Sequence, residues 1–299
     1  MSEKKEMLFI INPVAGRGKA SDSRDKLLEL FTQAGYNVRV FTTNKSGEAK
    51  HIAAQEGGLC DIAVCSGGDG TFHEMLSGIM TLEDRPVIGY IPTGTTNDFA
   101  SNMGIPKDPI RAARIIIEGE PFQCDIGAFN DEYFSYTAAF GAFTNVPYTT
   151  PQDLKNSIGK TAYVLEVVKN LQKLQSYRVQ IRCNEWAFDD EFIFGVVANS
   201  LSIAGIKGLM GRTVEMDDGL MEAMFIRKPP NAVVLGDVAQ RVLSGKPYHE
   251  YIISFKAREI EIESSKMPWT LDGEYGGMPD KVVIKDLPRA VTIMRANQS

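Results

Sequence analysis

The stretch SGGDGT at residues 66–71 places an aspartate among three glycines, directly after a hydrophobic run. Two more turns of glycine and small polar residues follow other hydrophobic runs, NPVAGRGKA at residues 12–20 and PTGTTNDF at residues 92–99. In an open α/β sheet such turns lie outside the carboxyl ends of the strands, where ligands bind. Their backbone N–H groups, together with a helix N-terminus, favour anions. The three turns therefore predict a phosphate-binding site at one edge of a sheet.

The aspartate in the second turn, Asp69, would repel a phosphate unless a divalent cation lay between the two. We therefore expect Asp69 to bind Mg²⁺, directly or through water, beside a nucleotide. The alternative is that Gly-Asp-Gly is only a tight turn with an Asx cap before a helix. Two common nucleotide motifs are not met, because Pro13 and Ala20 break a Walker loop and Ser21 replaces the third glycine of a dinucleotide fingerprint.

The elements that would position these turns alternate along residues 1–125. Strands are predicted at residues 7–12, 36–43, 61–65 and 86–92, and helices at residues 21–34, 47–55 and 71–80. Strands that alternate with helices predict a mostly parallel sheet that is covered on both faces. We expect this part of the chain to be an α/β domain.

The pattern changes after Asp125. Strand-like runs dominate, several of them with period-2 alternation, and two helical windows interrupt them, at residues 161–174 and 232–243. This shift predicts a second domain built as a largely antiparallel sheet or sandwich. We therefore expect one domain at residues 1–125 and another at residues 126–299, with the last residues able to return to the first.

The bulk composition narrows the choice of partners. A net charge of −6 argues against nucleic acid bound by a broad basic surface. The apolar runs fall far below the roughly 20 residues that a membrane-spanning helix needs. The four cysteines show no CxxC spacing, which is typical of buried free thiols in a reducing cytosol. We expect a soluble, cytoplasmic protein that does not bind nucleic acid.

Several motifs together resemble the bacterial diacylglycerol kinase and lipid kinase family, which is related to the catalytic domains of sphingosine and ceramide kinases. In chain order they are INPVAGRGKA, SGGDGTFHEMLSGI, PTGTTNDFASNMGIP, GRTVEMDDGLMEA and LDGEY. The last two resemble the family's acidic Asp-Asp-Gly loop and its Asp-Gly-Glu motif. GGDGT alone also occurs in NAD kinases and phosphofructokinases, whereas GGDGT followed by PTGTTNDFA and DGE is typical of lipid kinases.

The resemblance implies an N-terminal three-layer nucleotide-binding domain of the NAD-kinase and diacylglycerol-kinase type, a C-terminal β-sandwich, and a catalytic cleft between them. The implied ATP contacts are Asn12, Pro13, Val14, Ala15, Gly16, Thr43, Gly68, Asp69, Gly70, Thr71, Phe72, His73, Glu74 and Thr95. Phe72 and His73 stand where Leu and Asn are usual, and Ser101 replaces a frequent Arg. These departures leave the phosphate turn intact and concern substrate preference.

The resemblance also implies catalytic and metal-binding roles in the second half. Glu274 matches the general base that accepts the proton of a lipid hydroxyl, and Asp69 is the second catalytic residue. The implied metal ligands are the carboxylate of Asp218 and the main-chain oxygens of Glu215 and Leu220. The alternatives are that Glu274 caps a hairpin and that the Asp218 loop is a solvated acidic turn.

Three more polar residues have competing interpretations. Asp98 is expected to cap the helix that follows it rather than to take part in the chemistry. Asp272 either orients Glu274 or shapes a turn, and burial of Glu274 beside Asp272 and lipid would raise the pKa of Glu274. His73 is expected to contact nucleotide or to pack in the fold rather than to act as a base.

The function predicted from these motifs is an ATP- and Mg²⁺-dependent kinase of diacylglycerol or a similar lipid alcohol. Such an enzyme needs only transient contact with the inner membrane surface, and SIAGIKGLMGR at residues 202–212 is either the docking rim or a loop folded over the core. A homodimer is a possible oligomeric state, which the sequence leaves undecided. The alternative functions are a kinase of a soluble hydroxyl substrate, as in NAD kinase, and a non-catalytic nucleotide or lipid sensor.

Overall fold

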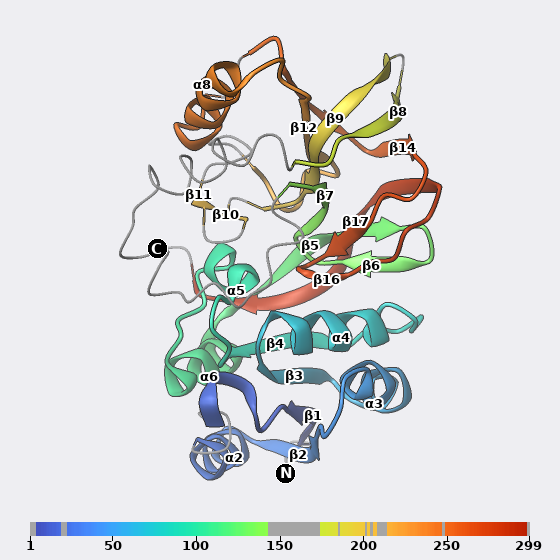
Figure 1. Ribbon diagram of the computed structural model, residues 1–299. Coiled ribbons are helices and arrows are strands. Elements are labelled where there is room, and N and C mark those ends of the chain that lie inside the picture. Colours follow the sequence, from blue (N-terminus) through green and yellow to red (C-terminus); the bar gives the residue numbers. More distant parts are fainter. Residues whose placement is uncertain are drawn as a thin grey trace. The chain divides into compact units, whose positions relative to one another are not determined.

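The computed structural model describes residues 4–18, 23–142, 174–184, 186–200, 202–203, 206–207, 214–246 and 249–297 (Figure 1). The chain divides into two compact units. The first contains Met1–Ile126, Glu132–Ser135 and Leu287–Ser299, and the second contains Gly127–Asp131 and Tyr136–Asp286. Strands β5 (Glu120–Phe129) and β17 (Lys281–Arg295) each contribute residues to both units.

The first unit is built on a parallel sheet with the strand order β4-β3-β1-β2. Its strands are β1 (Lys5–Ile11), β2 (Tyr36–Thr42), β3 (Ile62–Gly67) and β4 (Val87–Pro92), and the C-terminal end of β17 pairs with β4 in parallel. Every residue of β3 is buried, as expected of a strand covered on both faces. The predicted parallel α/β sheet is therefore confirmed.

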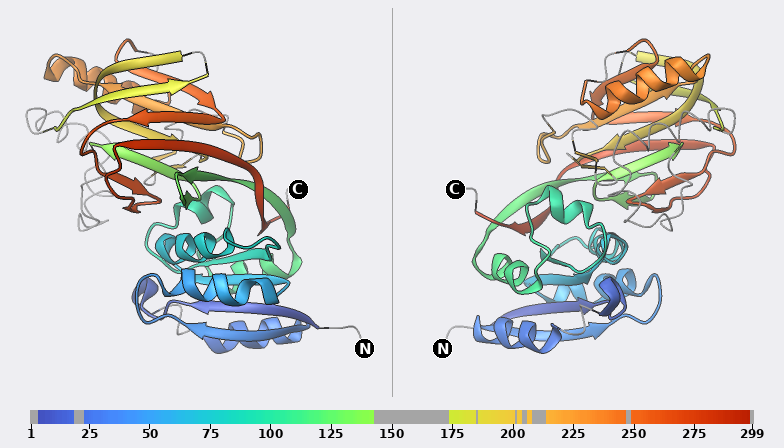
Figure 2. Two further views of the ribbon diagram at one scale, coloured as in Figure 1. Left: turned by 90° about the vertical axis from the view of Figure 1, so that its right-hand side faces the viewer. Right: turned by 60° about the vertical axis from the view of Figure 1, so that its left-hand side comes forward.

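Helices cover both faces of this sheet. They are α2 (Arg24–Gln33), α3 (Glu48–Glu56), α4 (Asp69–Ile79), α5 (Asp98–Asn102) and α6 (Pro109–Glu118), with short 3₁₀ turns η1 (Ala15–Gly18) and η2 (Gly57–Leu59). Figures 1 and 2 show α2 and α6 on one face and α3 and α4 on the other. This is the three-layer arrangement that the resemblance implied.

The boundaries of α4 differ from the sequence prediction in a way that matters for the site. The predicted helix began at Thr71, whereas α4 begins at Asp69, with the extended residue Gly68 as its N-cap. An acid in the first turn is stabilised by the helix dipole, which explains the earlier start. Asp69 therefore belongs to the helix N-terminus rather than to a loop before it.

The second unit is a β-sandwich whose strands pair in antiparallel fashion. Its strands are β7 (Thr137–Gly141), β8 (Tyr177–Cys183), β9 (Trp186–Ala198), β12 (Met221–Arg227), β13 (Ile252–Ala257), β14 (Glu259–Glu263), β15 (Trp269–Leu271) and β16 (Glu274–Tyr275). The first half of β9 pairs with β8, and its second half pairs with β7 and β12. The predicted antiparallel sandwich is confirmed.

Three short strands complete the described strands. They are β6 (Glu132–Phe134), which pairs with β5, and the pair β10 (Ser202–Ile203) and β11 (Ile206–Lys207). The rest of the proposed rim at residues 202–212 lies outside the described residues, as does the helix predicted at residues 161–174 apart from Leu174.

Helix α8 (Ala232–Leu243) closes one face of the sandwich and has the predicted boundaries. The side chain of Asn231 caps it by accepting the N–H groups of Val233 and Val234, both at 3.0 Å. Leu235 and Val238 pack in a buried cluster with strand residues. The apolar face of this helix is therefore part of the core.

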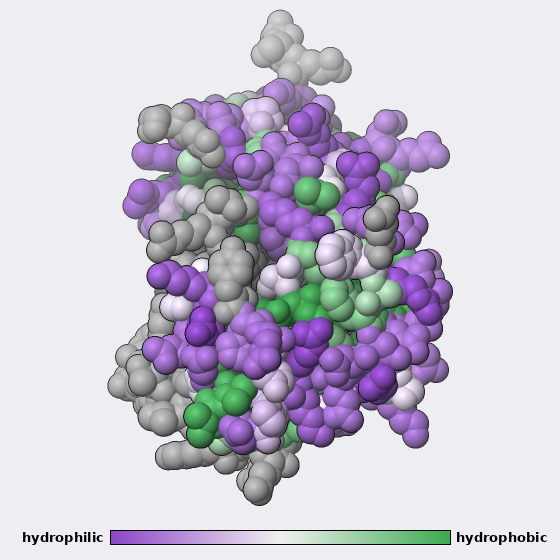
Figure 3. Space-filling model, turned by 90° about the horizontal axis from the view of Figure 1, so that it is seen from above, coloured by the Kyte–Doolittle hydropathy of each residue, from purple (hydrophilic) through white to green (hydrophobic). Residues whose placement is uncertain are grey.

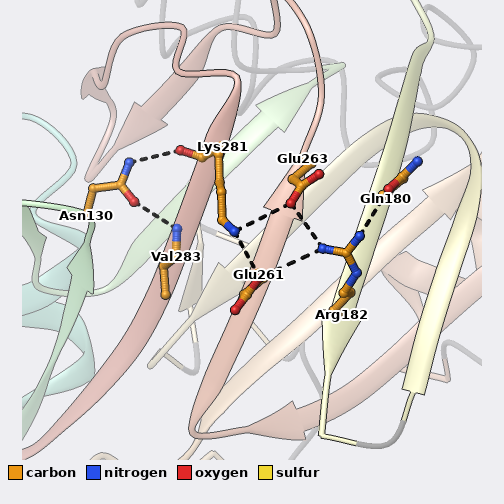
Figure 4. Close-up of polar contacts among 7 residues, drawn as sticks. All are labelled: Asn130, Gln180, Arg182, Glu261, Glu263, Lys281 and Val283. Atoms are coloured by element: carbon orange, nitrogen blue, oxygen red, sulfur yellow. Dashed lines mark hydrogen bonds and ion pairs between the residues drawn. The ribbon is translucent and has the colours of Figure 1, made fainter.

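Strand β8 has one buried face and one exposed face, which explains why apolar and polar residues alternate along it. Every second residue of β8 is buried, and the residues between them face outward. Figure 4 shows outward Arg182 on β8 contacting Glu263 at 3.0 Å and Glu261 at 3.9 Å on β14. Lys281 on β17 lies 3.3 Å from the carboxylate of Glu261 and 3.5 Å from that of Glu263. Alternating charges thus neutralise one another across three strands, although exposed pairs contribute little individually.

The face shown in Figure 3 is mostly polar, with apolar side chains in several smaller groups among the polar ones. Within the part of the chain that the structure describes, no helix is long and apolar enough to cross a membrane. Cys65, Cys124 and Cys183 are buried free thiols, and Cys60 is half-buried. The cysteine prediction is thus confirmed for three of the four residues.

Candidate active site

The three glycine-rich turns of the first unit meet at the carboxyl ends of β1, β3 and β4. Asn12, after β1, donates its side-chain N–H to the hydroxyl of Thr71 at 2.9 Å and its backbone N–H to the carbonyl of Ser66 at 2.9 Å. The second and third turns touch at their backbones, because a Cβ added to Gly94 would lie 2.5 Å from the Cα of Gly68. Only glycine at position 94 permits that approach. The structure therefore brings together the three turns that the sequence singled out.

Asp69 is the first residue of α4 and lies inside this cluster. The first helical hydrogen bond of α4 runs from the N–H of Phe72 to the carbonyl of Gly68, so the preceding N–H groups lie at the open end of the helix. The Oδ2 atom of Asp69 accepts the backbone N–H of Asp98 at 3.1 Å. An acid and helix-end amides thus occupy the same turn, as a site for a cation and a phosphate requires.

Asp98 does not have the role that we expected. The N-cap of α5 is Asn97, which adopts the left-handed conformation with φ of 55°, and Asp98 is the first helical residue. The prediction that Asp98 caps this helix is therefore wrong. Asn97 takes the cap position because Asn tolerates positive φ, and its side chain donates to the carbonyl of Gly94 at 2.7 Å. Asp98 is instead a second buried acid, 5% exposed, beside Asp69.

The cluster contains buried acids, and their charges affect the neighbouring Tyr90. Burial raises the pKa of the Tyr90 hydroxyl well above its ordinary value, and the charges of Asp69, Cys65 and Asp98 raise it further. Tyr90 therefore stays a neutral donor, 3.4 Å from Oδ1 of Asn97. The described residues contain no group of three or more His, Cys, Asp or Glu side chains arranged for a metal. Mg²⁺ commonly binds through one or two carboxylates plus substrate phosphates, and Asp69 at the start of α4 offers a carboxylate of that kind.

Other predicted ATP contacts surround the cluster in different ways. Val14 is 80% exposed, and its N–H binds the Asn12 side chain at 3.2 Å. Thr43 is buried after β2 and donates its N–H to the carbonyl of Ile11 at 2.9 Å. Thr95 is exposed, and its carbonyl accepts the ammonium of Lys107 at 3.2 Å. Lys107, a lone lysine after Gly-Ile-Pro, is not among the residues predicted from the sequence.

Two of the predicted nucleotide contacts on α4, Phe72 and Glu74, contact other parts of the protein. Phe72 is 1% exposed, and its ring lies 4.5 Å from the ring of Phe99 and 4.6 Å from that of Tyr90. This aromatic cluster accommodates the Phe that replaces the usual Leu. Glu74 binds the turn after β2 through its carboxylate, and His73 is half-buried. Contact of these residues with nucleotide stays a prediction.

In the second unit, Glu274 follows a two-residue hairpin turn. Leu271 pairs with Glu274, and the two residues between them, Asp272 and Gly273, have φ of 51° and 88°. Asp-Gly with two positive φ values is the sequence preferred by a tight type I′ hairpin. Glu274 is exposed on β16, and its burial by bound lipid stays a prediction. The turn presents the acid at the start of a strand.

Asp272 fixes this hairpin to the beginning of β7. Its Oδ1 atom accepts the backbone N–H groups of Tyr136 at 2.9 Å and Thr137 at 3.1 Å. Its own N–H donates to the carbonyl of Thr137 at 2.8 Å, and its carbonyl accepts the hydroxyl of Tyr136 at 3.0 Å. Asp272 therefore shapes the turn and also anchors the strand that carries Glu274, so the two interpretations of this residue are compatible.

This anchor gives a testable expectation. Asp272→Ala removes a buried acceptor of two N–H groups and places Ala at positive φ, so we expect the free energy of unfolding to fall by about 2–3 kcal/mol. Asp272→Asn keeps one acceptor oxygen and tolerates positive φ, so it should cost less than about 1 kcal/mol. Chemical denaturation measures both, with exposed Asp280→Ala as the control. An Ala variant as stable as the parent would contradict the anchoring role.

The carboxylate of Asp218 forms an ion pair with a lysine side chain of the protein. The Oδ2 atom of Asp218 lies 3.1 Å from the ammonium of Lys256, and its Oδ1 accepts the N–H of Leu220 at 3.0 Å. Lys256 also lies 2.8 Å from buried Glu222. Burial alone would lower the pKa of Lys256, but its bonds to Glu222 and Asp218 raise it. A metal at Asp218 would have to share the carboxylate with Lys256, and the metal site stays a prediction.

Known protein families and relatives match this chain over most of its length. Residues 6–129 match the family described as the diacylglycerol kinase catalytic domain, and residues 142–295 match the YegS C-terminal NAD kinase beta sandwich-like domain. The diacylglycerol kinase of Bacillus subtilis (strain 168) is 36% identical over 279 residues, which cover 92% of this chain and 91% of the relative. That of Staphylococcus carnosus (strain TM300) is 32% identical over 92% of this chain and 90% of its own.

A solved structure has the same fold. The crystal structure of a putative diacylglycerol kinase from Bacillus anthracis str. Sterne matches with a TM-score of 0.82, covering 99% of this chain and 98% of that one, at 23% identity. At this identity the structural similarity supports the fold alone, whereas the two relatives at 36% and 32% identity support membership of the same family. The matches confirm the resemblance stated from the motifs, and the chain, a phosphotransferase, belongs to the diacylglycerol kinase family.

Proposed function

We propose that this protein transfers the γ-phosphate of ATP, with Mg²⁺, to the hydroxyl of diacylglycerol or a similar lipid alcohol. The observation that carries the proposal is the meeting of three glycine-rich turns around Asp69 at the start of α4. Phosphoryl transfer depends on positioning and on neutralisation of phosphate charge, and this cluster offers groups for both. The relatives named above are diacylglycerol kinases, which supports the lipid acceptor.

The nucleotide would bind to the first unit. Backbone N–H groups at the start of α4 would hold phosphate oxygens, and Lys107 lies close enough to Thr95 to add a positive charge at the third turn. Asp69 would hold Mg²⁺, with Asp98 beside it. When bound, Mg²⁺ supplies charge neutralisation for the transferred phosphoryl group. The paired acids would otherwise repel the phosphates.

The lipid acceptor needs a base, and Glu274 is the residue we assign to it. A primary hydroxyl is a poor nucleophile until its proton is transferred, and a carboxylate within hydrogen-bond reach can accept that proton. Glu274 stands exposed on a hairpin held by Asp272, which keeps the acid accessible and fixed. Tyr275 on β16 is 71% exposed and Met278, three residues after it, is 55% exposed, so an approaching lipid would meet apolar side chains there.

We further propose that the protein meets the membrane only transiently, at the inner surface. Diacylglycerol resides in the bilayer, so the enzyme must reach that surface to find it. A net charge of −6 opposes strong binding to anionic lipid. Peripheral contact through a few exposed apolar side chains is consistent with that charge.

The acidic loop gives a second metal prediction. Asp218 with the main-chain oxygens of Glu215 and Leu220 offers the hard oxygen ligands that Mg²⁺ or Ca²⁺ prefers. We expect Asp218→Ala to weaken both the activity and its dependence on divalent ions, whereas Asp217→Ala in the same loop should change neither by more than about twofold. Kinetics across a Mg²⁺ titration measure this. A crystal soaked in a heavier divalent ion that showed no density at Asp218 would contradict the site.

The acceptor class can be tested by thin-layer chromatography. Purified protein is incubated with γ-labelled ATP and either a lipid extract or NAD. The proposal predicts label in a lipid product and none in NADP. Label in NADP alone would favour the soluble-substrate alternative, and the absence of any Mg²⁺-dependent ATP turnover would favour a sensor.

A further inference from the structure

Glu74 lies on α4, little more than one turn after Asp69, and its carboxylate binds a different segment of the chain. Its Oε1 atom accepts the N–H of Gly47 at 2.7 Å and the hydroxyl of Ser46 at 3.0 Å. Its Oε2 atom accepts the N–H of Ala49 at 3.2 Å. Both oxygens of Glu74 therefore bind the turn between β2 and α3, which is 25 or more residues away in the sequence.

These donors form the N-terminus of α3. Gly47 is the N-cap residue, in the left-handed conformation with φ of 82°, and it has no side chain with which to cap the helix. Helix N-termini present N–H groups that require an acceptor, and they favour negative charge. Glu74 provides both from the neighbouring helix. It therefore caps α3 in place of the usual Ser, Thr, Asp or Asn side chain.

The same turn is held at its other end by Glu48. The Oε2 atom of Glu48 accepts the N–H of Asn44 at 2.6 Å and that of Lys45 at 3.4 Å. The preceding residue, Thr43, is tied to β1 by its bond to the carbonyl of Ile11. Two carboxylates thus fix the conformation of the turn that begins at Thr43.

Helices α3 and α4 also pack closely against each other at Gly78. Gly78 lies four residues after Glu74, on the same face of α4, and a Cβ there would collide with the carbonyl oxygen of Lys50 and lie 2.8 Å from the Cβ of Ala53. The absence of a side chain at Gly78 allows the helices to meet. One helix, α4, therefore begins at the acidic turn and caps the helix that follows Thr43.

We propose that Glu74 is a positioning residue that holds the Thr43 turn in its nucleotide-binding conformation, rather than a nucleotide ligand. This inference rests on the proposed nucleotide-binding function, with Thr43 among the ATP contacts that the resemblance implies. The carboxylate of Glu74 is already committed to Ser46, Gly47 and Ala49. Its function is to couple the phosphate turn at the start of α4 to the turn after β2.

The test begins without nucleotide, by measuring amide hydrogen exchange in three variants. Glu74→Ala should speed exchange at Gly47 and Ala49 by about tenfold, because both amides lose their acceptor. Glu74→Gln keeps one acceptor oxygen and should give an intermediate rate. Glu132→Ala, which removes an exposed carboxylate paired with Lys50 of α3 at 3.1 Å, is the matched control and should leave both rates unchanged. Unchanged exchange in Glu74→Ala would overturn the proposal.

The kinetic part uses a double-mutant cycle with Thr43→Val. Glu74→Ala should raise the KM for ATP by about tenfold while kcat at saturating ATP stays within about twofold, with Glu74→Gln partly restoring the KM. In the double variant the increases should not multiply, because both changes act on one contact. Multiplicative effects would indicate an independent nucleotide contact by Glu74. A lowered Tm with a parental KM would indicate a merely structural role, and either result would overturn the proposal.

The failure of this inference can be told apart from failure of the proposed function. If the parent protein binds no ATP, the proposed function fails, and this inference fails with it even when exchange at Gly47 rises. If the parent binds ATP and Glu74→Ala has a parental KM, only the positioning role fails. Calorimetric titration of the parent with Mg²⁺ and ATP decides between these cases.

Discussion

Replacing Asp69 by asparagine is expected to lower the rate of phosphoryl transfer by at least about 100-fold while the protein stays folded. The change removes one negative charge from a turn where helix-end N–H groups and the Asp98 amide converge. Asn keeps an oxygen that can accept the N–H of Asp98, so the local hydrogen bond survives. What is lost is the charge that would hold Mg²⁺ against the phosphates.

Turnover measured over a Mg²⁺ titration, with circular dichroism to confirm folding, checks this expectation. Asp108→Asn is a suitable control, because Asp108 caps α6 by accepting the N–H of Arg111 at 2.8 Å and Asn caps equally well. Its turnover should stay within about twofold of the parent. Near-normal activity of Asp69→Asn with an unchanged Mg²⁺ requirement would reduce Asp69 to a turn residue.

The second large effect is expected at Glu274. Glu274→Gln keeps the size and the hydrogen-bonding capacity of the side chain but cannot accept the hydroxyl proton, so transfer should slow by about 100-fold or more. ATP affinity should be unchanged, because Glu274 lies on the β16 hairpin of the second unit and the nucleotide turns belong to the first. Single-turnover transfer to lipid and equilibrium ATP binding, measured on the same preparation, separate the two quantities.

A matched control exists on another strand of the second unit. Glu259 on β14 is also an exposed glutamate, paired with Lys285 at 3.2 Å, and Glu259→Gln should transfer phosphate at the parental rate. Should Glu274→Gln transfer phosphate to lipid nearly as fast as the parent, Glu274 is not the base. The hairpin alternative, in which this acid only follows a tight turn, would then be preferred.

Local sequence signals were sufficient for much of the fold. The alternation of buried runs and helical windows predicted the parallel sheet of the first unit, and the period-2 pattern of β8 predicted a sheet with one buried face. The pair Asp272-Gly273 has the composition of a type I′ hairpin, and the structure has that turn. Each of these signals depends on residues close together in the chain.

The parts that could not be predicted depend on contacts between distant residues. Glu74 is expected from the motif to contact nucleotide, but its carboxylate binds a turn 25 or more residues earlier, which no local pattern encodes. Asp98 looks like a helix cap in the sequence, but its backbone N–H donates to Asp69, 29 residues earlier, and Asn97 is the N-cap. Likewise, the ammonium of Lys256 reaches Asp218 across 38 residues. Tertiary packing decided each case.

The most direct test of the proposed function is transfer of γ-labelled phosphate from ATP to diacylglycerol in mixed micelles, with Mg²⁺ present or removed by a chelator. We predict a labelled phosphorylated lipid only when ATP, Mg²⁺ and the lipid alcohol are all present, and its loss in Asp69→Asn and Glu274→Gln. Transfer that persists in the chelator, or ATP turnover with no labelled lipid from any alcohol offered, would contradict an ATP- and Mg²⁺-dependent lipid kinase.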